Sequence, residues 1–328
     1  MFEKKVEETI KQFNMIEKGD RVLVAVSGGP DSMSLLNYLF DNKELFKIEI
    51  FACHVNHGIR ENAKIDEEYV KKYCEEKNIK LFINHSDIPS IAKDEKRGIE
   101  ETGRKVRYEF FEKIAKEENI SKIAVAHNKN DNAETVIMNL LRGSGLSGIK
   151  GIEAKRKKYI RPLIECERQE IEDYCERKKI NPRHDESNDD NNYTRNKIRN
   201  VVIPYIKNEF NPNIIDTLKR FSDIIKEDEE FIESITNETF EKLASISNNE
   251  ISFVVKEFNE NPIVIQKSLI KKSIKMVTGS LNEIDKVNIE DIIKLCNNNI
   301  GNKYLLPNKN VRIEMKSKKI IIKKEKSI

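Results

Sequence analysis

The chain has 328 residues, enough for two domains, and it is 38% hydrophobic and 35% charged, so it can bury a core. A net charge of +3 is a weak indication of a nucleic-acid partner. Five scattered cysteines without a Cys-x-x-Cys pair argue against a disulfide framework or a zinc site. The N-terminus is charged and amphipathic, and no apolar run reaches membrane-spanning length. These features predict a cytoplasmic protein with no membrane partner.

The N-terminal half of the chain alternates between two hydrophobic periods. Strand-like runs fall at 21–26, 48–55, 80–84 and 122–126. Helical patterns lie between and after them, at 31–41, 62–78, 100–118 and 131–142. This alternation predicts an α/β fold with a doubly wound parallel sheet and helices on both faces. The carboxyl ends of such strands share one edge, where ligands bind in open α/β sheets.

The strand signal fades after residue 165. A helical pattern covers 165–180, a polar, turn-rich segment covers 181–197, and a charged helical pattern covers 214–246. We therefore expect a catalytic domain over 1–212 and a smaller, mostly helical domain with a β-like tail over 213–328.

A strand, a Ser-Gly-Gly turn and a helix follow one another in RVLVAVSGGPDS, residues 21–32. The glycines let backbone N–H groups approach phosphate oxygens, and the helix N-terminus adds positive dipole. The predicted ATP-binding residues here are Ser27, Gly28, Gly29, Pro30, Asp31 and Ser32. A carboxylate beside phosphates repels them, so Asp31 predicts a Mg²⁺ ion between the two.

Polar clusters also follow the second and fourth predicted strands. The first contains His54, Asn56 and His57, which we assign to ATP binding, and the second runs from His127 to Asp131. The inferred topology brings both clusters to the same rim as the Ser-Gly-Gly turn.

The string SGGPDS resembles the loop of the N-type ATP pyrophosphatases. The resemblance implies cleavage of ATP between the α- and β-phosphates, adenylation of a carbonyl-type oxygen and release of pyrophosphate. The lysine of a Walker-type loop is absent, as expected where the γ-phosphate is not transferred.

Five further strings narrow the resemblance. They are HVNHGIRENA (54–63), ETGRKVRYEFF (101–111), AHNKNDNAETVIMNLLRGSGLSGIKGI (126–152), RPLI (161–164) and DESNDDNNYTRNKIRN (185–200). In this order they resemble the tRNA(Ile)-lysidine synthetase family. The resemblance implies that free L-lysine is ligated to C2 of the wobble cytidine in tRNA(Ile) with a CAU anticodon. ATP is consumed to AMP and pyrophosphate, and Mg²⁺ is required.

The implied chemistry can be matched to residues. The cytidine C2 carbonyl resists an amine until attack of its O2 on the α-phosphate makes that oxygen an AMP leaving group. The lysine ε-amine must then be neutral and close to C2. We assign Asp31, His127 and Asp131 to catalysis and Glu134 to substrate positioning, and the choice of base between His127 and Asp131 stays open. On the same helical pattern, Leu140 and Leu141 are expected in the core.

The match has a departure. Family members often carry two consecutive histidines and two consecutive aspartates in this stretch, whereas Asn128 and Asn130 stand here in place of the second His and the first Asp.

Arginines inside the matching strings suit phosphates of ATP or RNA. They are Arg104, Arg107, Arg142, Arg195 and Arg199. The basic stretch 155–161 and the lysine-rich tail from Lys316 are candidate RNA-backbone tracks, with a solvated charge run an equal alternative for the tail. Longer family members carry a further C-terminal domain, so the chain is expected to be a short form or a trimmed one. A homodimer is left open.

Three other functions are alternatives to this one. A tRNA 2-thiolation enzyme shares the loop but usually needs paired cysteines, and an amidotransferase-linked synthetase needs an ammonia source. A non-catalytic RNA-binding module would not need the SGGPDS loop at all.

Overall fold

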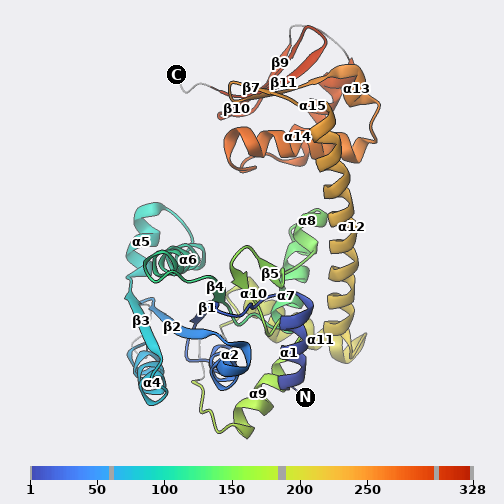
Figure 1. The fold of residues 1–328 in the computed structure, drawn as a ribbon. Helices are drawn as coiled ribbons and strands as arrows, with labels where there is room; N and C mark the ends of the chain where they lie inside the picture. The colour runs from blue at the N-terminus through green and yellow to red at the C-terminus, as the bar shows by residue number, and fades with distance from the viewer. Residues whose placement is uncertain (1, 59–62, 184–189, 299–302, 326–328) are drawn as a thin grey trace. The chain divides into compact units, whose positions relative to one another are not determined.

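The computed structural model describes residues 2–58, 63–183, 190–298 and 303–325 (Figure 1). Parts of two motifs, residues 59–62 and 184–189, and the last three residues of the basic tail lie outside the described residues. The chain forms two compact units, 1–223 and 224–328. The division falls within one long helix, α12 (Ile214–Leu243), whereas the boundary expected from the sequence lies after residue 212.

The first unit is built on a six-stranded sheet with the order β3-β2-β1-β4-β6-β5. Its strands are β1 (Arg21–Ala25), β2 (Glu49–Asn56), β3 (Lys80–His85), β4 (Lys122–Ala124), β5 (Lys155–Arg156) and β6 (Tyr159–Ile160). Neighbours from β3 to β6 are parallel, and β5 runs antiparallel to β6. The chain winds outward from β1 to β3 and then returns to place β4 on the other side of β1. A topological switch point therefore lies between β1 and β4.

Helices cover both faces of this sheet, as the sequence predicts. Those of the first unit are α1 (Phe2–Gln12), α2 (Pro30–Asp41), α3 (Lys43–Phe46), α4 (Ala63–Glu76), α5 (Ile88–Glu95), α6 (Ile99–Glu117), α7 (Lys129–Leu141), α8 (Leu146–Ile149), α9 (Arg168–Arg177), α10 (Thr194–Lys197), the π-helix η2 (Ile198–Val202), α11 (Ile203–Glu209) and the first part of α12.

Alternation along β1 divides its side chains between two cores. Val22 and Val24 pack with residues of α1, α2, α4 and α9, whereas Leu23 packs with residues of α6 on the opposite face. Figure 1 shows α2 and α4 on one side of strands β1–β3 and α6 on the other. Strand periodicity and burial on both faces thus agree, and the predicted fold class is confirmed.

Two leucines of α7 that were expected in the core are exposed. Ala133, Val136 and Ile137 are buried, but Leu140 is 57% exposed and Leu141 is 70% exposed. The helix runs past the residues that cover its inner side, so the apolar stripe continues into solvent.

The second unit contains more β-structure than its sequence indicates. A five-stranded antiparallel sheet has the order β7-β8-β11-β10-β9. Its strands are β7 (Ser245–Ser247), β8 (Glu250–Val254), β9 (Tyr304–Asn308), β10 (Val311–Lys316) and β11 (Lys319–Lys324). Its helices, after the end of α12, are α13 (Val255–Asn259), α14 (Ile263–Thr278) and α15 (Lys286–Asn298). Alternate residues of β10 and β11, such as Ile313 and Ile320, join residues of α14 and α15 in one core.

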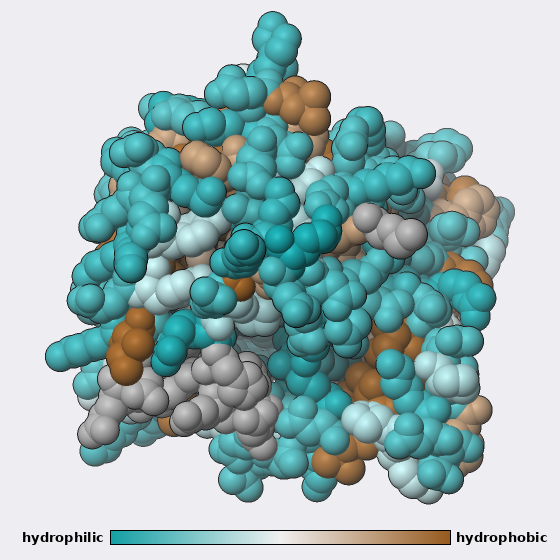
Figure 2. Space-filling view, turned by 90° about the horizontal axis from the view of Figure 1, so that it is seen from below, coloured by the Kyte–Doolittle hydropathy of each residue, from teal (hydrophilic) through white to brown (hydrophobic). Residues whose placement is uncertain are grey.

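The surface matches the high charge of the chain. The face in Figure 2 is predominantly hydrophilic, with apolar side chains in separate patches. Among the described residues, no helix combines the length and apolarity needed to cross a membrane.

Candidate active site

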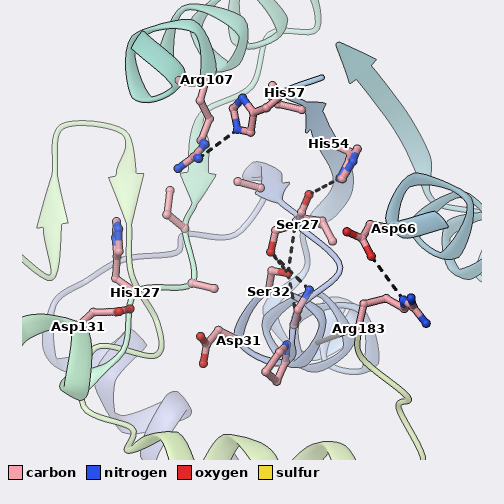
Figure 3. A pocket seen from close by; sticks show the side chains of 18 of the residues that line it. Ser27, Asp31, Ser32, His54, His57, Asp66, Arg107, His127, Asp131 and Arg183 are labelled. Atoms are coloured by element: carbon pink, nitrogen blue, oxygen red, sulfur yellow. Dashed lines mark hydrogen bonds and ion pairs between the residues drawn. The ribbon is translucent and has the colours of Figure 1, made fainter. Parts of the chain in front are cut away.

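A cavity of about 680 Å³ opens at the carboxyl ends of β1, β2 and β4, beside the switch point (Figure 3). It gathers thirteen of the residues singled out from sequence. They are Ser27, Gly29, Pro30, Asp31, Ser32, His54, Asn56, His57, Arg107, His127, Asp131, Arg195 and Arg199. Gly28, Arg104, Glu134 and Arg142 are not among the residues that line it. The topology argument therefore brings together three segments far apart in sequence.

The loop after β1 is a closed, prearranged turn. The Ser27 backbone N–H donates to Ser32 Oγ (3.0 Å), and that hydroxyl donates to the Gly29 carbonyl (3.1 Å). Gly28 has φ +92°, a backbone conformation that residues with a side chain rarely adopt. The Gly28 carbonyl accepts a hydrogen bond from the Arg183 N–H (2.9 Å). The turn is thus held from both sides before any phosphate arrives.

Three helix N-termini converge next to this loop. Helix α2 begins at Pro30, the Asn128 amide caps α7, and α9 begins at Arg168. Asn128 Nδ2 donates to Asp31 Oδ1 (3.0 Å), and the Arg168 N–H donates to Asn130 Oδ1 (3.1 Å). The two asparagines that depart from the family pattern therefore join the three helices. Positive ends of helix dipoles favour anions at this point.

Asp31 and Asp131 both line the cavity and form an acidic pair whose charges interact. Burial, and then the charge of Asp131, raise the pKa of Asp31 to about 6, while Arg168 opposes the shift. Figure 3 shows the two carboxylates beside the same space as His127. Within the described ranges, no three acidic, histidine or cysteine side chains form a metal-binding group. A divalent ion here would need further oxygen ligands from a substrate.

Two arginines bridge the carboxylates of α7. Glu134, which is 1% exposed, accepts from Arg195 Nε (2.8 Å) and Arg199 Nε (2.5 Å). Asp131 Oδ1 accepts from the Nη2 atoms of both arginines, each at 3.1 Å. Glu134 thus lies behind the cavity wall as the anchor of two arginines that line it. Arg199 is in the π-helix η2, a local irregularity that is frequent at functional sites.

The surroundings of His127 favour a neutral imidazole. Burial, followed by the charge of Arg161, lowers the pKa of His127 well below its usual value. Arg161 Nε donates to its Nδ1 (3.0 Å).

His54 and Asn56, at the carboxyl end of β2, are also held by hydrogen bonds. The Val26 carbonyl accepts from His54 Nδ1 (2.9 Å), and Asn56 Nδ2 donates to Glu67 Oε2 (3.0 Å). Burial alone would raise the pKa of Glu67, but bonds from Lys71, Asn56 and His85 lower it to about 2. On the opposite wall, Arg107 donates to His57 Nε2 (3.2 Å).

Several cavity residues were missed by sequence reasoning. Arg168 lines the cavity and is half-buried, and its guanidinium makes no hydrogen bond or ion pair with the described residues. Arg183 also lines the cavity and forms an ion pair with Asp66 (3.4 Å). Tyr193 is a further residue of the cavity wall, and it is 43% exposed. Their segments, a helix and a turn-rich stretch, carry no spacing that separates them from solvated charge.

Some predicted basic residues lie away from the cavity lining. Arg142 is exposed at the C-terminus of α7, and Arg104 is exposed on α6, where it stacks over the Tyr108 ring. The basic stretch 155–161 contains the β5–β6 hairpin, and most of the lysine-rich tail is in paired strands.

The fold and this loop define a class: residues 2–206 match the family described as PP-loop domain. Over longer stretches the chain is similar to named enzymes. It is 43% identical over 307 residues to a tRNA(Ile)-lysidine synthase of Clostridium perfringens, covering 93% of this chain and 65% of the relative. It is 41% identical to that of Clostridioides difficile, covering 99% and 71%. The chain therefore belongs to the tRNA(Ile)-lysidine synthase family, and the resemblance inferred from its motifs is confirmed.

The match covers almost all of this chain, but the chain spans only 65% of the length of the C. perfringens relative. Among solved structures, the U34-tRNA thiolase NcsA from Methanococcus maripaludis has a TM-score of 0.55 and 20% identity, over 69% of this chain and 78% of the thiolase. That likeness shows a shared fold and nothing about substrate.

Proposed function

We propose that the chain is an ATP-dependent ligase that joins L-lysine to C2 of the wobble cytidine of tRNA(Ile) with a CAU anticodon. The products are lysidine, AMP and pyrophosphate. One observation carries the proposal. In a chain of this family, the PP-loop (residues 27–32, including Asp31), His127 and Asp131 surround one cavity at the switch point of the sheet.

In the first step, cytidine O2 attacks the α-phosphorus of ATP, and the bond from that phosphorus to the bridging oxygen breaks. The Ser27–Ser32 turn and the N-terminus of α2 bind the departing pyrophosphate through N–H and hydroxyl donors. Arg168 and Arg183 add positive charge to the same wall. We add both residues to the proposed ATP site.

The acidic pair fits a role for Mg²⁺. A buried carboxylate with a raised pKa beside a second carboxylate favours a bound cation, and Mg²⁺ is usually held by one or two carboxylates and substrate phosphates. Asp31 is the proposed protein ligand, and the ion would neutralise charge on the phosphates.

In the second step, the ε-amine of lysine attacks C2, and the C2–O2 bond breaks so that O2 leaves with AMP. The ammonium group must first lose a proton. Asp131 is the cavity carboxylate proposed to help bind and deprotonate it, while Glu134 acts indirectly by holding Arg195 and Arg199.

The tRNA needs a surface larger than this cavity. We propose that the exposed arginines Arg104, Arg107 and Arg142 contact RNA phosphates. In the second unit, Lys271 and Lys275 are exposed one turn apart on α14, which supports tRNA binding by that unit. With these substrates, a cytoplasmic location is the expected one.

The thiolation alternative has little chemical support here. All five cysteines are buried, and burial raises the pKa of Cys74, Cys166, Cys175 and Cys296 to about 12, so thiolate is scarce.

The test is transfer of labelled lysine. The protein is incubated with ATP, Mg²⁺, labelled lysine and an unmodified CAU-anticodon tRNA(Ile) transcript, with a UAU-anticodon transcript as the matched control. We expect label and stoichiometric pyrophosphate with the CAU transcript alone. The proposal fails if no label enters this RNA, or if the uridine transcript is labelled equally.

A further inference from the structure

Arg161 is the last residue of the basic stretch 155–161, a candidate RNA-backbone track, yet it is buried. It is 7% exposed and follows β6, at the start of the RPLI string. Its Nη1 donates to the Glu153 carbonyl (2.6 Å), and its Nε donates to His127 Nδ1 (3.0 Å). The backbone of the strand region therefore holds a guanidinium against the catalytic histidine.

The hydrogen bond from Arg161 determines which ring nitrogen of His127 carries the proton. A guanidinium has five N–H donors and no acceptor, and it stays protonated in proteins. Nδ1 must therefore be the acceptor and carry no proton. In a neutral imidazole the proton is then on Nε2.

The surrounding charges keep the ring neutral. Arg161 at the end of β6, Arg195 from α10, and Arg104 and Arg107 from α6 all act on His127. Together with burial they lower its pKa well below the usual value, so an imidazolium is disfavoured. The ring is left with a single N–H, at Nε2.

We propose that Arg161 is a positioning residue that fixes His127 as the neutral Nε2–H tautomer, so that His127 donates a hydrogen bond in the cavity and does not act as the proton-accepting base. The inference rests on the proposed function for the identity of the acceptor, which is an oxygen of the α-phosphate or of the cytidine. A donor aimed at an oxygen that gains charge stabilises the transition state. The proton lost by lysine then passes to another group, and Asp131 is the carboxylate in place.

The ring state can be measured without any substrate. Ring ¹⁵N NMR of histidine-labelled protein reports which nitrogen carries the proton, and a His127→Gln variant assigns the signal among the five histidines. We expect His127 to show a protonated Nε2 and a bare Nδ1. A protonated Nδ1, or an even mixture of tautomers, overturns the inference.

Variants test the role of Arg161 itself. Arg161→Met should shift the tautomer and slow pyrophosphate release roughly tenfold or more, with the KM for ATP little changed. Arg161→Lys, which keeps one donor, should recover part of both properties. Arg177→Met, which removes an exposed arginine paired with Glu3, is the matched control and should change neither.

The outcomes separate this inference from the function proposed above. An Nε2–H ring in a protein that never transfers lysine refutes the function but keeps the positioning role. An active enzyme in which Arg161→Met folds, keeps the wild-type ¹⁵N signature and keeps its rate overturns the positioning role. If that variant does not fold, the wild-type ring spectrum alone decides.

Discussion

Burial makes the charged form of Asp31 unfavourable in the free protein, although we propose that the reaction needs this carboxylate. Burial beside Asp131 raises its pKa to about 6, from an ordinary 3.8. The carboxylate of Asp31 therefore binds a proton more tightly in the folded protein than in the unfolded chain. The stability that protonated Asp31 contributes is lost as the pH rises from about 4 to about 6, and it does not return above that range.

Asp31→Asn should consequently stabilise the substrate-free protein while abolishing its activity. The neutral amide keeps an acceptor for Asn128 but removes the buried charge, so we expect a gain of about 1–3 kcal/mol at pH 7.5 that vanishes near pH 4. Urea unfolding at both pH values measures it, and pyrophosphate release should fall to background while tRNA binding persists. Equal stability of variant and wild type at pH 7.5 would contradict this account of Asp31.

At the scale of elements, α7 shows what the sequence could and could not predict. Its start near the rim follows from the strand before it, and the spacing of Asp131 and Glu134 places them on one side of the helix. The partners of Glu134 could not be predicted, because Arg195 lies 61 residues further along the chain. Helical spacing identifies a shared face, but only the tertiary structure shows that arginines cover it.

Asn128 joins the capping of α7 to the PP-loop, and two substitutions separate these roles. Asn128→Ala should remove the cap and destabilise the protein by about 1 kcal/mol, as well as slow pyrophosphate release. Asn128→Asp can still cap the helix, so its stability should stay closer to wild type. However, it places a third carboxylate beside Asp31 and Asp131 and should weaken ATP binding in the absence of Mg²⁺.

Thermal melts and ATP titrations distinguish these two effects. The linking role is wrong if Asn128→Ala loses stability but keeps the wild-type rate of pyrophosphate release.

At the scale of the whole molecule, the first unit does not end where the sequence changes character. Ile215 of α12 packs in one core with Ile137, Ile198 and Ile203. The same part of α12 pairs Asp216 with Lys129 and bonds Ser222 to Asn132. Turn-forming residues marked a boundary after 212, but the apolar face of the next helix belongs to the preceding unit.

The second unit shows a related limit. Its β10–β11 hairpin could be predicted from alternation, whereas β7 has three exposed residues and no periodic signal, so the sheet they share was not apparent.

Two fragments test the division of the chain. A fragment of residues 1–223 should fold cooperatively, whereas 1–212 should lose the contacts of Ile215 and Asp216 and unfold at a clearly lower urea concentration. Equal midpoints would mean that α12 adds nothing to the first unit. The 1–223 fragment should also bind tRNA more weakly than the full chain, because it lacks the lysines of α14.

We propose above all that the cavity turns cytidine O2 into a leaving group on AMP. It is tested most directly by placing ¹⁸O at O2 of the wobble cytidine in the CAU transcript and analysing the AMP formed with ATP and lysine by mass spectrometry. The proposed mechanism predicts one ¹⁸O in the phosphate of each AMP released during lysine transfer. AMP without ¹⁸O, formed while lysine enters the RNA, would contradict it.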